Sequence, residues 1–420
     1  MSWVQRDAAV VWHGFTQMAA YAENQPIIVE AGEGRELIDV AGNRYLDAIS
    51  SLWVMTLGHR VPELDQALRE QLDRIAHSTM LGNGNRVVIE LSEALARVVP
   101  VDGPHFLYAG DGATAVEQAL KIAFQYWVNR GEPRTGFVGL AGAYHGDTVG
   151  ALSLGDSGFG TSIFHPLRFP VIRAATVADA VDIVLRRGDE LVAVVVEPLV
   201  QAANAMAMLD PDALCDLGDA CAETGVLLIC DEVATGFGRT GTLFASEQCG
   251  LRPDLLALGK GMSGGYLALS ATVASDRVFR AFLGPDQSDK ALYHGHSYGG
   301  NALACSVALR HLQLLDEWDV LANVRARETQ LQARLNEVLA PLRPVGDIRL
   351  RGLMGGVDLL APDPQLCWGR RVCAAAVRRG VLLRPIGDTV ILMAPLTLTA
   401  DEADQIVAAL HDAIVEVCCE

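Results

Sequence analysis

Short apolar runs alternate with helical patterns in the middle of the chain, between about residues 105 and 275. Most of these runs lack the polar/apolar alternation of a half-exposed sheet, as expected for strands that are buried on both faces. The segments 113–127 and 211–225 between them fit crossover helices. The pattern predicts an α/β fold with a mostly parallel central sheet. The expected strands lie within residues 105–110, 136–142, 191–198, 225–232, 254–260 and 267–275.

The two ends of the chain mix strands and helices. Residues 30–49 predict a hairpin with its turn near residues 41–43. After residue 310 the pattern predicts a long helix, further strands and a final helix, at whose start Thr399 and Glu402 are expected to form a capping box. We therefore expect a smaller α+β domain made from both chain ends beside a large domain. The expected parts are 1–60 and 310–420 for the small domain and 61–309 for the large one.

Composition and charge narrow the class of protein. Half of the 420 residues are hydrophobic and 20% are charged, which allows a sizeable core and excludes the disordered class. The net charge of −18 argues against nucleic acid or an anionic membrane as partner. The start has no apolar run of signal-peptide length, and no segment reaches the roughly 20 apolar residues that span a bilayer. The expectation is a soluble cytoplasmic protein.

Cysteine and histidine spacing predicts neither a disulfide framework nor a metal site. The nine cysteines are scattered, their number is odd and no C-x-x-C occurs. His294 and His296 have one residue between them, but no carboxylate or cysteine neighbour that would complete a metal site.

Lysine is rare in this chain, and one lysine lies in unusual surroundings. Of the 33 basic residues only Lys121, Lys260 and Lys290 are lysines. Lys260 follows the apolar run of "DLLALGKGMSGG" and precedes glycines, where burial favours a lowered pKa and a neutral amine that can act as a nucleophile. Lys121 lies four residues after Glu117, which predicts a helical surface pair, and Lys290 lies in a polar loop. Lys260 is therefore the chemical candidate.

Other distinctive groups follow the predicted strands, where the ligands of open α/β sheets bind. Gly112 and Ala113 start a helix and offer backbone N–H groups that suit a phosphate, although such a turn can also be only structural. Glu197 and Asp231 each end a buried strand and must find a partner; Asp231 is either a helix N-cap or a carboxylate held against a cationic ligand atom. His145 fits a general base, a metal ligand or a structural residue.

Together these motifs resemble those of the class III (ω-amino acid type) aminotransferases, which are pyridoxal 5′-phosphate enzymes of fold type I. The most specific match is "DEVATGFGRTG" followed by "DLLALGKGMSGG". "ISSLWV", "YHGDTVGALS" and "HGHSYGGNALAC" resemble the biotin-pathway branch of the family, which aminates 8-amino-7-oxononanoate. The resemblance covers essentially the whole chain and implies an α/β fold with the two domains described above.

The resemblance also implies how the cofactor is held. Lys260 would bond to the cofactor aldehyde and later carry a proton between the substrate carbon and C4′, and Asp231 would pair with the pyridine nitrogen. Tyr144 would stack on one ring face and Val233 would pack on the other. The remaining implied contacts are those of Gly112 and Ala113 with the phosphate, and of Ser297 from a second subunit with the same phosphate, which implies a homodimer.

For the substrate, Arg384 in "LLRPIGD" resembles the residue that receives the carboxylate of the oxo acid. Taken alone, it would fit a surface ion pair. Arg239 in "GFGRTG" resembles a further site residue. Trp53, Tyr144 and Phe15 would line an apolar slot for a long aliphatic chain, with Asp147 near its polar end. Taken alone, Trp53 fits the core better, and only the surrounding "SSLWV" match favours the site.

Departures from the family pattern leave the amino donor open. The phosphate turn is "GDGA" where D-S-G-S is common, so the hydroxyl at position 113 is lost, and Phe15 stands where many members have tyrosine. "HGHSY" differs from the "HGPTF" of enzymes that use S-adenosylmethionine, and similar forms occur in relatives that use lysine. The alternatives are another ω-amino acid or diamine transaminase with pyruvate or 2-oxoglutarate as acceptor, a mutase or racemase with the same cofactor, and a protein that has lost catalysis.

Overall fold

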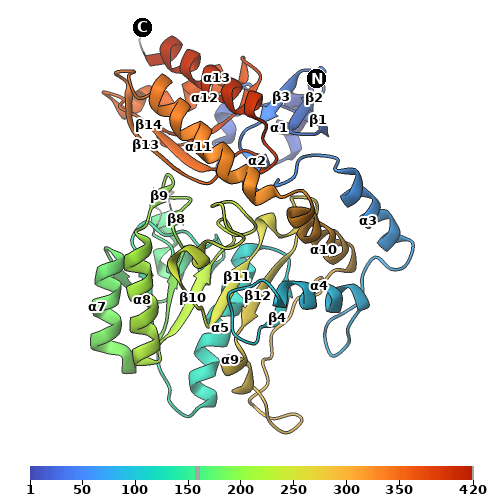
Figure 1. The fold of residues 1–420 in the computed structure, drawn as a ribbon, viewed down its shortest axis with the longest axis vertical. Coiled ribbons are helices and arrows are strands. Elements are labelled where there is room, and N and C mark those ends of the chain that lie inside the picture. Colours follow the sequence, from blue (N-terminus) through green and yellow to red (C-terminus); the bar gives the residue numbers. More distant parts are fainter. Residues whose placement is uncertain (157–160, 419–420) are drawn as a thin grey trace.

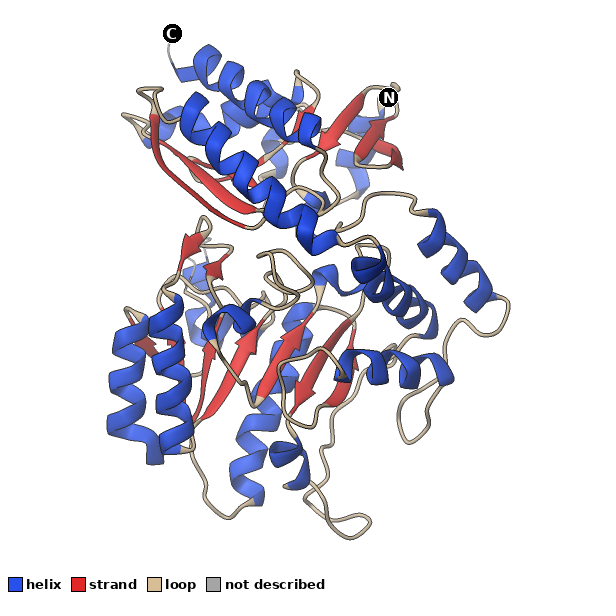
Figure 2. Cartoon of the chain, viewed as in Figure 1, coloured by secondary structure: helices blue, strands red, loops and turns tan. Residues whose placement is uncertain are grey.

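A seven-stranded sheet forms the centre of the larger body in the computed structural model, which describes residues 1–156 and 161–418 (Figures 1 and 2). β12 runs antiparallel to both of its neighbours and the remaining pairs are parallel, which confirms the mostly parallel sheet. The order across the sheet is β4 (His105–Ala109), β12 (Ser270–Ala274), β11 (Leu255–Leu258), β10 (Leu227–Asp231), β7 (Leu191–Val196), β5 (Gly136–Leu140) and β6 (Ile172–Ala174).

The strands predicted from apolar runs all form. β7, β10, β11 and β12 are buried along their whole length, because their sequences offer no polar face to solvent. The crossover helices also form: α5 (Gly112–Asn129) packs against β11 and β12, whereas α7 (Val177–Arg187) and α8 (Pro211–Thr224) pack against each other. Strand β6 was not predicted.

The smaller body, at the top of Figure 1, joins the two ends of the chain. β15 (Val381–Leu382) pairs in parallel with the N-terminal strand β3 (Arg44–Asp47), so residues more than 300 positions apart share one sheet. That sheet continues through β2 (Glu36–Asp39) and β1 (Val29–Glu33), and a second sheet has the order β13 (Val345–Arg351), β14 (Met354–Leu359), β17 (Thr389–Leu392) and β16 (Arg384–Ile386). The helices of this body include α11 (Val320–Val338), α12 (Trp368–Val377) and α13 (Ala400–Cys418).

Two local predictions for the chain ends are confirmed. The hairpin of β2 and β3 turns at residues 40–43, and at the start of α13 Thr399 Oγ1 accepts from the Glu402 N–H while Glu402 Oε2 accepts from the Thr399 N–H. The domain boundaries at residues 60/61 and 309/310 stay predictions.

The remaining α-helices and strands are α1 (Trp3–Val10), α2 (Ser50–Trp53), α3 (Pro62–Leu72), α4 (Arg86–Ala96), α6 (Val149–Leu154), α9 (Asp276–Arg280), α10 (Ala302–Glu317), β8 (Val200–Gln201) and β9 (Ala207–Met208).

The predicted pairing of Lys121 with Glu117 is wrong. Glu117 Oε1 accepts from Thr148 Oγ1 and from the N–H groups of Gly150 and Ala151, so this carboxylate stabilises the start of α6. Lys121 Nζ lies 3.0 Å from His294 Nδ1 instead.

Within the described ranges, 1–156 and 161–418, no helix is long and apolar enough to cross a membrane. The same residues bring together no group of three or more His, Cys, Asp or Glu side chains that could hold a metal ion. Cys419, one of the nine cysteines of the sequence, lies outside the described residues.

Candidate active site

A cavity of about 870 Å³ lies where the strand ends of the large body meet the smaller body. Its lining includes most of the predicted site residues, although they come from distant parts of the chain. We call the groups after the sheet strands the floor (Gly112, His145, Glu197, Asp231 and Lys260), and the exposed groups from the chain ends the rim (Phe15, Leu52, Arg370 and Arg384). The predicted residues that line the cavity are Phe15, Trp53, Gly112, Ala113, Tyr144, Asp147, Asp231, Val233, Lys260 and Arg384.

A buried ion-pair geometry fixes the carboxylate of Asp231, the last residue of β10. Its Oδ2 lies 2.7 Å from His145 Nδ1, and its Oδ1 accepts from the Val233 N–H at 3.0 Å. His145 Nε2 is buried and has no hydrogen-bond partner among the described residues. Because an ionised carboxylate can only accept, His145 Nδ1 is assigned as the donor of this hydrogen bond to Asp231. These two hydrogen bonds fix the position of the Asp231 carboxylate inside the cavity.

Glu197 is a second buried carboxylate of the floor, directly after β7, and is 5% exposed. Its oxygens accept from the N–H groups of Tyr144 (3.1 Å) and Ala202 (3.2 Å). Burial raises the pKa of Glu197 to about 7, with a further rise from Asp231, while His145 and the two N–H donors act against this shift. The sequence marked Glu197 as a buried carboxylate that needs a partner but did not place it in the site.

Lys260 lies on the floor after β11, the strand that pairs with β10. Its backbone has φ +38°, a left-handed conformation that a residue with a side chain rarely adopts and that is common at functional sites. Burial lowers the pKa of the Lys260 ammonium, while Asp231 and Glu197 partly offset the effect. Its Nζ lies 5.0 Å from the centroid of the Trp53 ring. The predicted amine in apolar surroundings is therefore present.

The start of α5 offers the N–H groups expected for an anion. Asp111 is the N-cap, and its carboxylate accepts from the Thr114 N–H (2.9 Å) and the Thr114 hydroxyl (2.7 Å). A Cβ on Gly112 would lie 2.5 Å from Val233 Cγ1, so only glycine lets the helix start approach the strand end so closely. Ala113 also lines the cavity, without a hydroxyl.

A turn of left-handed backbone places Trp53 in the wall of the cavity. Residues 50–53 all have positive φ, between 48° and 73°, although none of them is glycine. Asp47 holds this turn by accepting from the N–H (2.9 Å) and the hydroxyl (2.7 Å) of Ser51, and Ser50 Oγ donates to the Met393 carbonyl at 2.6 Å. Trp53 is 8% exposed, and its indole Nε1 has no partner within the described part of the chain.

The loop after β5 supplies an aromatic wall. The Tyr144 hydroxyl donates to Asp147 Oδ2 at 3.0 Å, and burial raises the pKa of the phenol, as does the neighbouring carboxylate. Val233 follows β10 and is half-buried. Both side chains line the same cavity as Lys260 and Asp231.

Two predicted site residues do not line this cavity. Arg239 is 1% exposed, and its Nη atoms donate to the carbonyls of Ala394 (2.6 Å) and Met55 (2.7 Å). These bonds tie the loop after β10 to both chain ends; the substrate contact of Arg239 stays a prediction. Ser297 is exposed, and its carbonyl accepts from His77 Nε2 at 2.7 Å.

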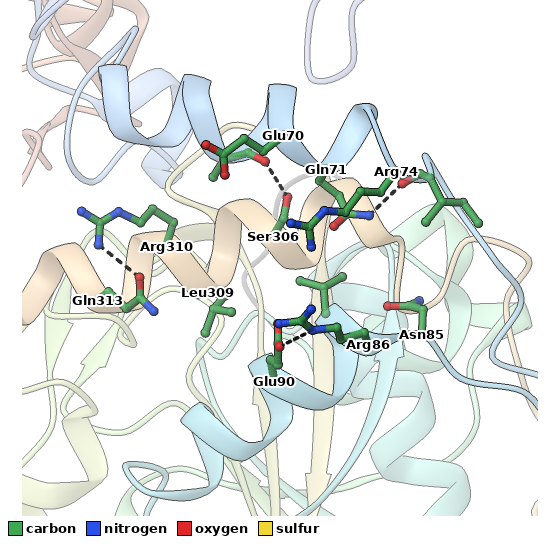
Figure 3. A pocket seen from close by; sticks show the side chains of 13 residues that line it. Glu70, Gln71, Arg74, Asn85, Arg86, Glu90, Ser306, Leu309, Arg310 and Gln313 are labelled. Carbon is green, nitrogen blue, oxygen red and sulfur yellow. Dashed lines mark hydrogen bonds and ion pairs between the residues drawn. The ribbon is translucent and has the colours of Figure 1, made fainter.

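The rim contains two guanidinium groups, and the sequence analysis found only one of them. Arg370 and Arg384 both line the cavity and are exposed, and no ion pair or hydrogen bond of either side chain exists among the described residues. Arginines with carboxylate partners line a different hollow, of about 350 Å³, between α3, α4 and α10 (Figure 3). There, Arg86 pairs with Glu90 (2.6 Å) and Arg310 with Glu317 (2.6 Å), so two of its cations are already neutralised.

Comparisons with known proteins identify the class. The aminotransferase class-III family profile matches residues 17–414. An adenosylmethionine-8-amino-7-oxononanoate aminotransferase from Nitratidesulfovibrio vulgaris is 43% identical over 443 residues, covering 98% of this chain and 81% of the relative. The crystal structure of an enzyme of the same name from Methanocaldococcus jannaschii has a TM-score of 0.95 at 38% identity, covering 99% of this chain and 98% of that one.

An amine transaminase from an uncultivated Pseudomonas species, solved in its PLP-bound form, is 32% identical with a TM-score of 0.90, covering 97% of this chain and 99% of that one. The chain therefore belongs to the class III aminotransferases. As a member of this family it is an aminotransferase, and its cofactor is pyridoxal 5′-phosphate (PLP). These findings confirm the resemblance seen in the sequence.

Proposed function

We propose that this chain transfers an amino group, with PLP, to 8-amino-7-oxononanoate, giving 7,8-diaminononanoate in biotin biosynthesis. The amino donor is S-adenosylmethionine or lysine. One observation carries the proposal: a single cavity joins a reactive amine on its floor to unpaired guanidinium groups on its rim. This separation suits a substrate whose reacting carbon and carboxylate lie at opposite ends of an aliphatic chain, and the acceptor named in the relatives has that form.

The floor offers partners for the aldehyde and for the ring nitrogen of the cofactor. When bound, PLP supplies an aldehyde that condenses with amines and a ring that accepts the electron pair of a broken C–H bond. Lys260 would hold the aldehyde and would later carry the proton taken from the substrate carbon, since burial favours its neutral amine. Asp231 would pair with the protonated pyridine nitrogen, and His145 keeps Asp231 in place.

Backbone and apolar groups orient the cofactor. The N–H groups of Gly112 and Ala113, at the positive end of α5, bind the phosphate. Tyr144 would pack on one face of the ring and Val233 on the other. Ser297 of the partner subunit reaches the same phosphate, so the active unit is a homodimer. Exposure of Ser297 outside the cavity of its own chain supports this assignment.

The rim and the upper wall bind the substrate. Arg384 receives the carboxylate through its guanidinium fork. Trp53, Tyr144 and Phe15 line the path of the aliphatic chain, and Asp147 lies near its polar end. We place the enzyme in the cytoplasm, where the chain meets its small-molecule substrates without a membrane or nucleic acid partner.

A spectral half-reaction tests the function. S-adenosylmethionine and lysine are added separately to the PLP-loaded enzyme without acceptor, and the absorption band of the bound cofactor is followed. The expected result is bleaching by one of the two donors and recovery of the band on addition of 8-amino-7-oxononanoate. Bleaching only by small ω-amines, with recovery by pyruvate or 2-oxoglutarate, would instead favour a general ω-amino acid transaminase. Retention of the amino nitrogen within one substrate molecule would indicate a mutase or racemase.

A further inference from the structure

The start of α12 is held tightly against the turn between β16 and β17. The Gly369 N–H donates to Asp388 Oδ1 at 2.8 Å. A Cβ on Gly369 would lie 2.4 Å from the Gly387 carbonyl oxygen and 3.0 Å from Pro385 Cβ, so no larger residue fits at this position. The position of the next residue, Arg370, is therefore fixed relative to the turn that follows Arg384.

A second guanidinium group, besides the one expected from the sequence, lines the same cavity. Both Arg370 and Arg384 line the 870 Å³ cavity and are exposed. Neither has a carboxylate partner in residues 1–156 or 161–418, although the chain has 51 acidic and only 33 basic residues. Arginines elsewhere on the surface often have such partners, as in the pairs Arg44–Glu36 and Arg86–Glu90.

From their place in the lining of one cavity, we propose that Arg370 is a second carboxylate-binding residue, which shares with Arg384 the terminal carboxylate of the oxo-acid acceptor. This inference rests on the proposed function, because it takes that acceptor as the occupant of the cavity. A net charge of −18 repels an anionic substrate, and two unpaired guanidinium groups at the rim give the entrance a local positive potential. A guanidinium fork matches the two oxygens of a carboxylate.

The chain offers a matched control in the neighbouring residue. Arg371 is also exposed and lies on α12, but it does not line the cavity, so Arg371→Gln removes the same charge without removing the proposed contact. The two variants are compared with wild type in steady-state kinetics on the PLP-loaded enzyme. The acceptor is supplied as the free acid and as its uncharged methyl ester.

For Arg370→Gln we expect KM for the free acid to rise roughly three- to tenfold, as for the loss of one solvent-exposed charged contact, with little change in kcat. KM for the methyl ester should be about the same in Arg370→Gln as in wild type. Arg371→Gln should resemble wild type with both acceptors. An equal rise for both variants would show a general charge effect, and an unchanged KM in Arg370→Gln would show that Arg370 makes no contact; either result overturns the inference.

The failure of this inference can be distinguished from failure of the proposed function. If wild type does not turn over 8-amino-7-oxononanoate, the proposed function fails, and the inference about its carboxylate fails with it. If wild type and Arg371→Gln turn it over and only Arg384→Gln loses affinity, the function stands and Arg370 has no part in it. The double variant Arg370→Gln/Arg384→Gln adds a check, since shared binding of one carboxylate predicts non-additive effects on KM.

Discussion

The floor and the rim of the cavity solve different physical problems. On the floor, Asp231 and Glu197 are buried, and backbone N–H groups and His145 hold them in one arrangement. On the rim, Phe15 is 65% exposed, and Arg370 and Arg384 are exposed and have no ion-pair partner within residues 1–156 and 161–418. Groups that act on electrons and protons gain from a low dielectric environment and fixed geometry, whereas groups that admit a charged substrate must be reachable. Changes on the floor should therefore affect kcat, and changes on the rim should affect KM.

Lys260→Ala should give the largest effect. The variant loses the amine that we propose holds the cofactor aldehyde and moves the proton, so transamination should fall by more than roughly a thousandfold. PLP can still bind noncovalently through the groups around Asp231 and Gly112. Turnover and cofactor content are measured together, with circular dichroism as the check on folding. Undiminished turnover would contradict the assignment of the floor as the reactive region.

Arg384→Gln tests the rim. A charged hydrogen bond contributes about 1.5–3 kcal/mol, so KM for the oxo-acid acceptor should rise about tenfold or more. The value of kcat should change little, because the carboxylate is bound equally before and during the chemical step. Steady-state kinetics with saturating donor measures both. A fall in kcat at unchanged KM would break the distinction between rim and floor.

The sequence predicted the floor well because continuous apolar strands lead directly into it. Asp231 and Lys260 each follow a strand that is buried along its whole length, so the end of the apolar run fixes their place at the carboxyl edge of the sheet. The same reasoning could not reveal that β12 runs antiparallel, since an apolar run carries no direction. β6, with three residues, was too short to stand out.

The rim depends on contacts that are remote in sequence, and the prediction was poorer there. "WGRRV" shows two adjacent arginines at a helix start, and only the contact of Gly369 with Asp388 determines which one faces the cavity. Phe15 and Arg384 were found by resemblance to a family. The left-handed turn at residues 50–53 had no sequence signal, because residues other than glycine rarely adopt positive φ. Arg239 matched a family motif, yet its buried bonds to two carbonyls keep it out of the cavity.

Glu197→Gln tests the cost of a buried floor carboxylate. Burial raises the pKa of Glu197 to about 7 in the folded chain, against an ordinary value of 4.5. The folded state therefore binds this proton more tightly than the unfolded state, and the free energy of unfolding of wild type should fall as pH rises from about 4.5 to about 7. Glu197→Gln does not lose stability in this way. Its melting temperature should therefore match that of wild type near pH 4.5 and exceed it above about pH 7.

Glu223→Gln, on an exposed position of α8, is the control for that comparison, since it removes the same charge without removing a buried group. Thermal unfolding is followed at several pH values for the three proteins. A melting-temperature difference between Glu197→Gln and wild type that does not vary with pH would show that Glu197 does not titrate in this range.

Asp111→Asn should have the smallest effect and sharpens the description of the floor. Asp111 is an exposed carboxylate at the N-cap of α5, beside the N–H groups that we assign to the cofactor phosphate. Asparagine caps a helix about as well as aspartate, so the bond to the Thr114 N–H can persist while the negative charge is removed. Less repulsion of the phosphate should tighten PLP binding about threefold, because exposed charges interact with well under 1.4 kcal/mol. Equilibrium titration of the cofactor-free protein with PLP measures the change. Weaker binding would instead mean that Asp111 strengthens PLP binding by ordering the turn through Thr114, and that this effect exceeds the repulsion between its charge and the phosphate.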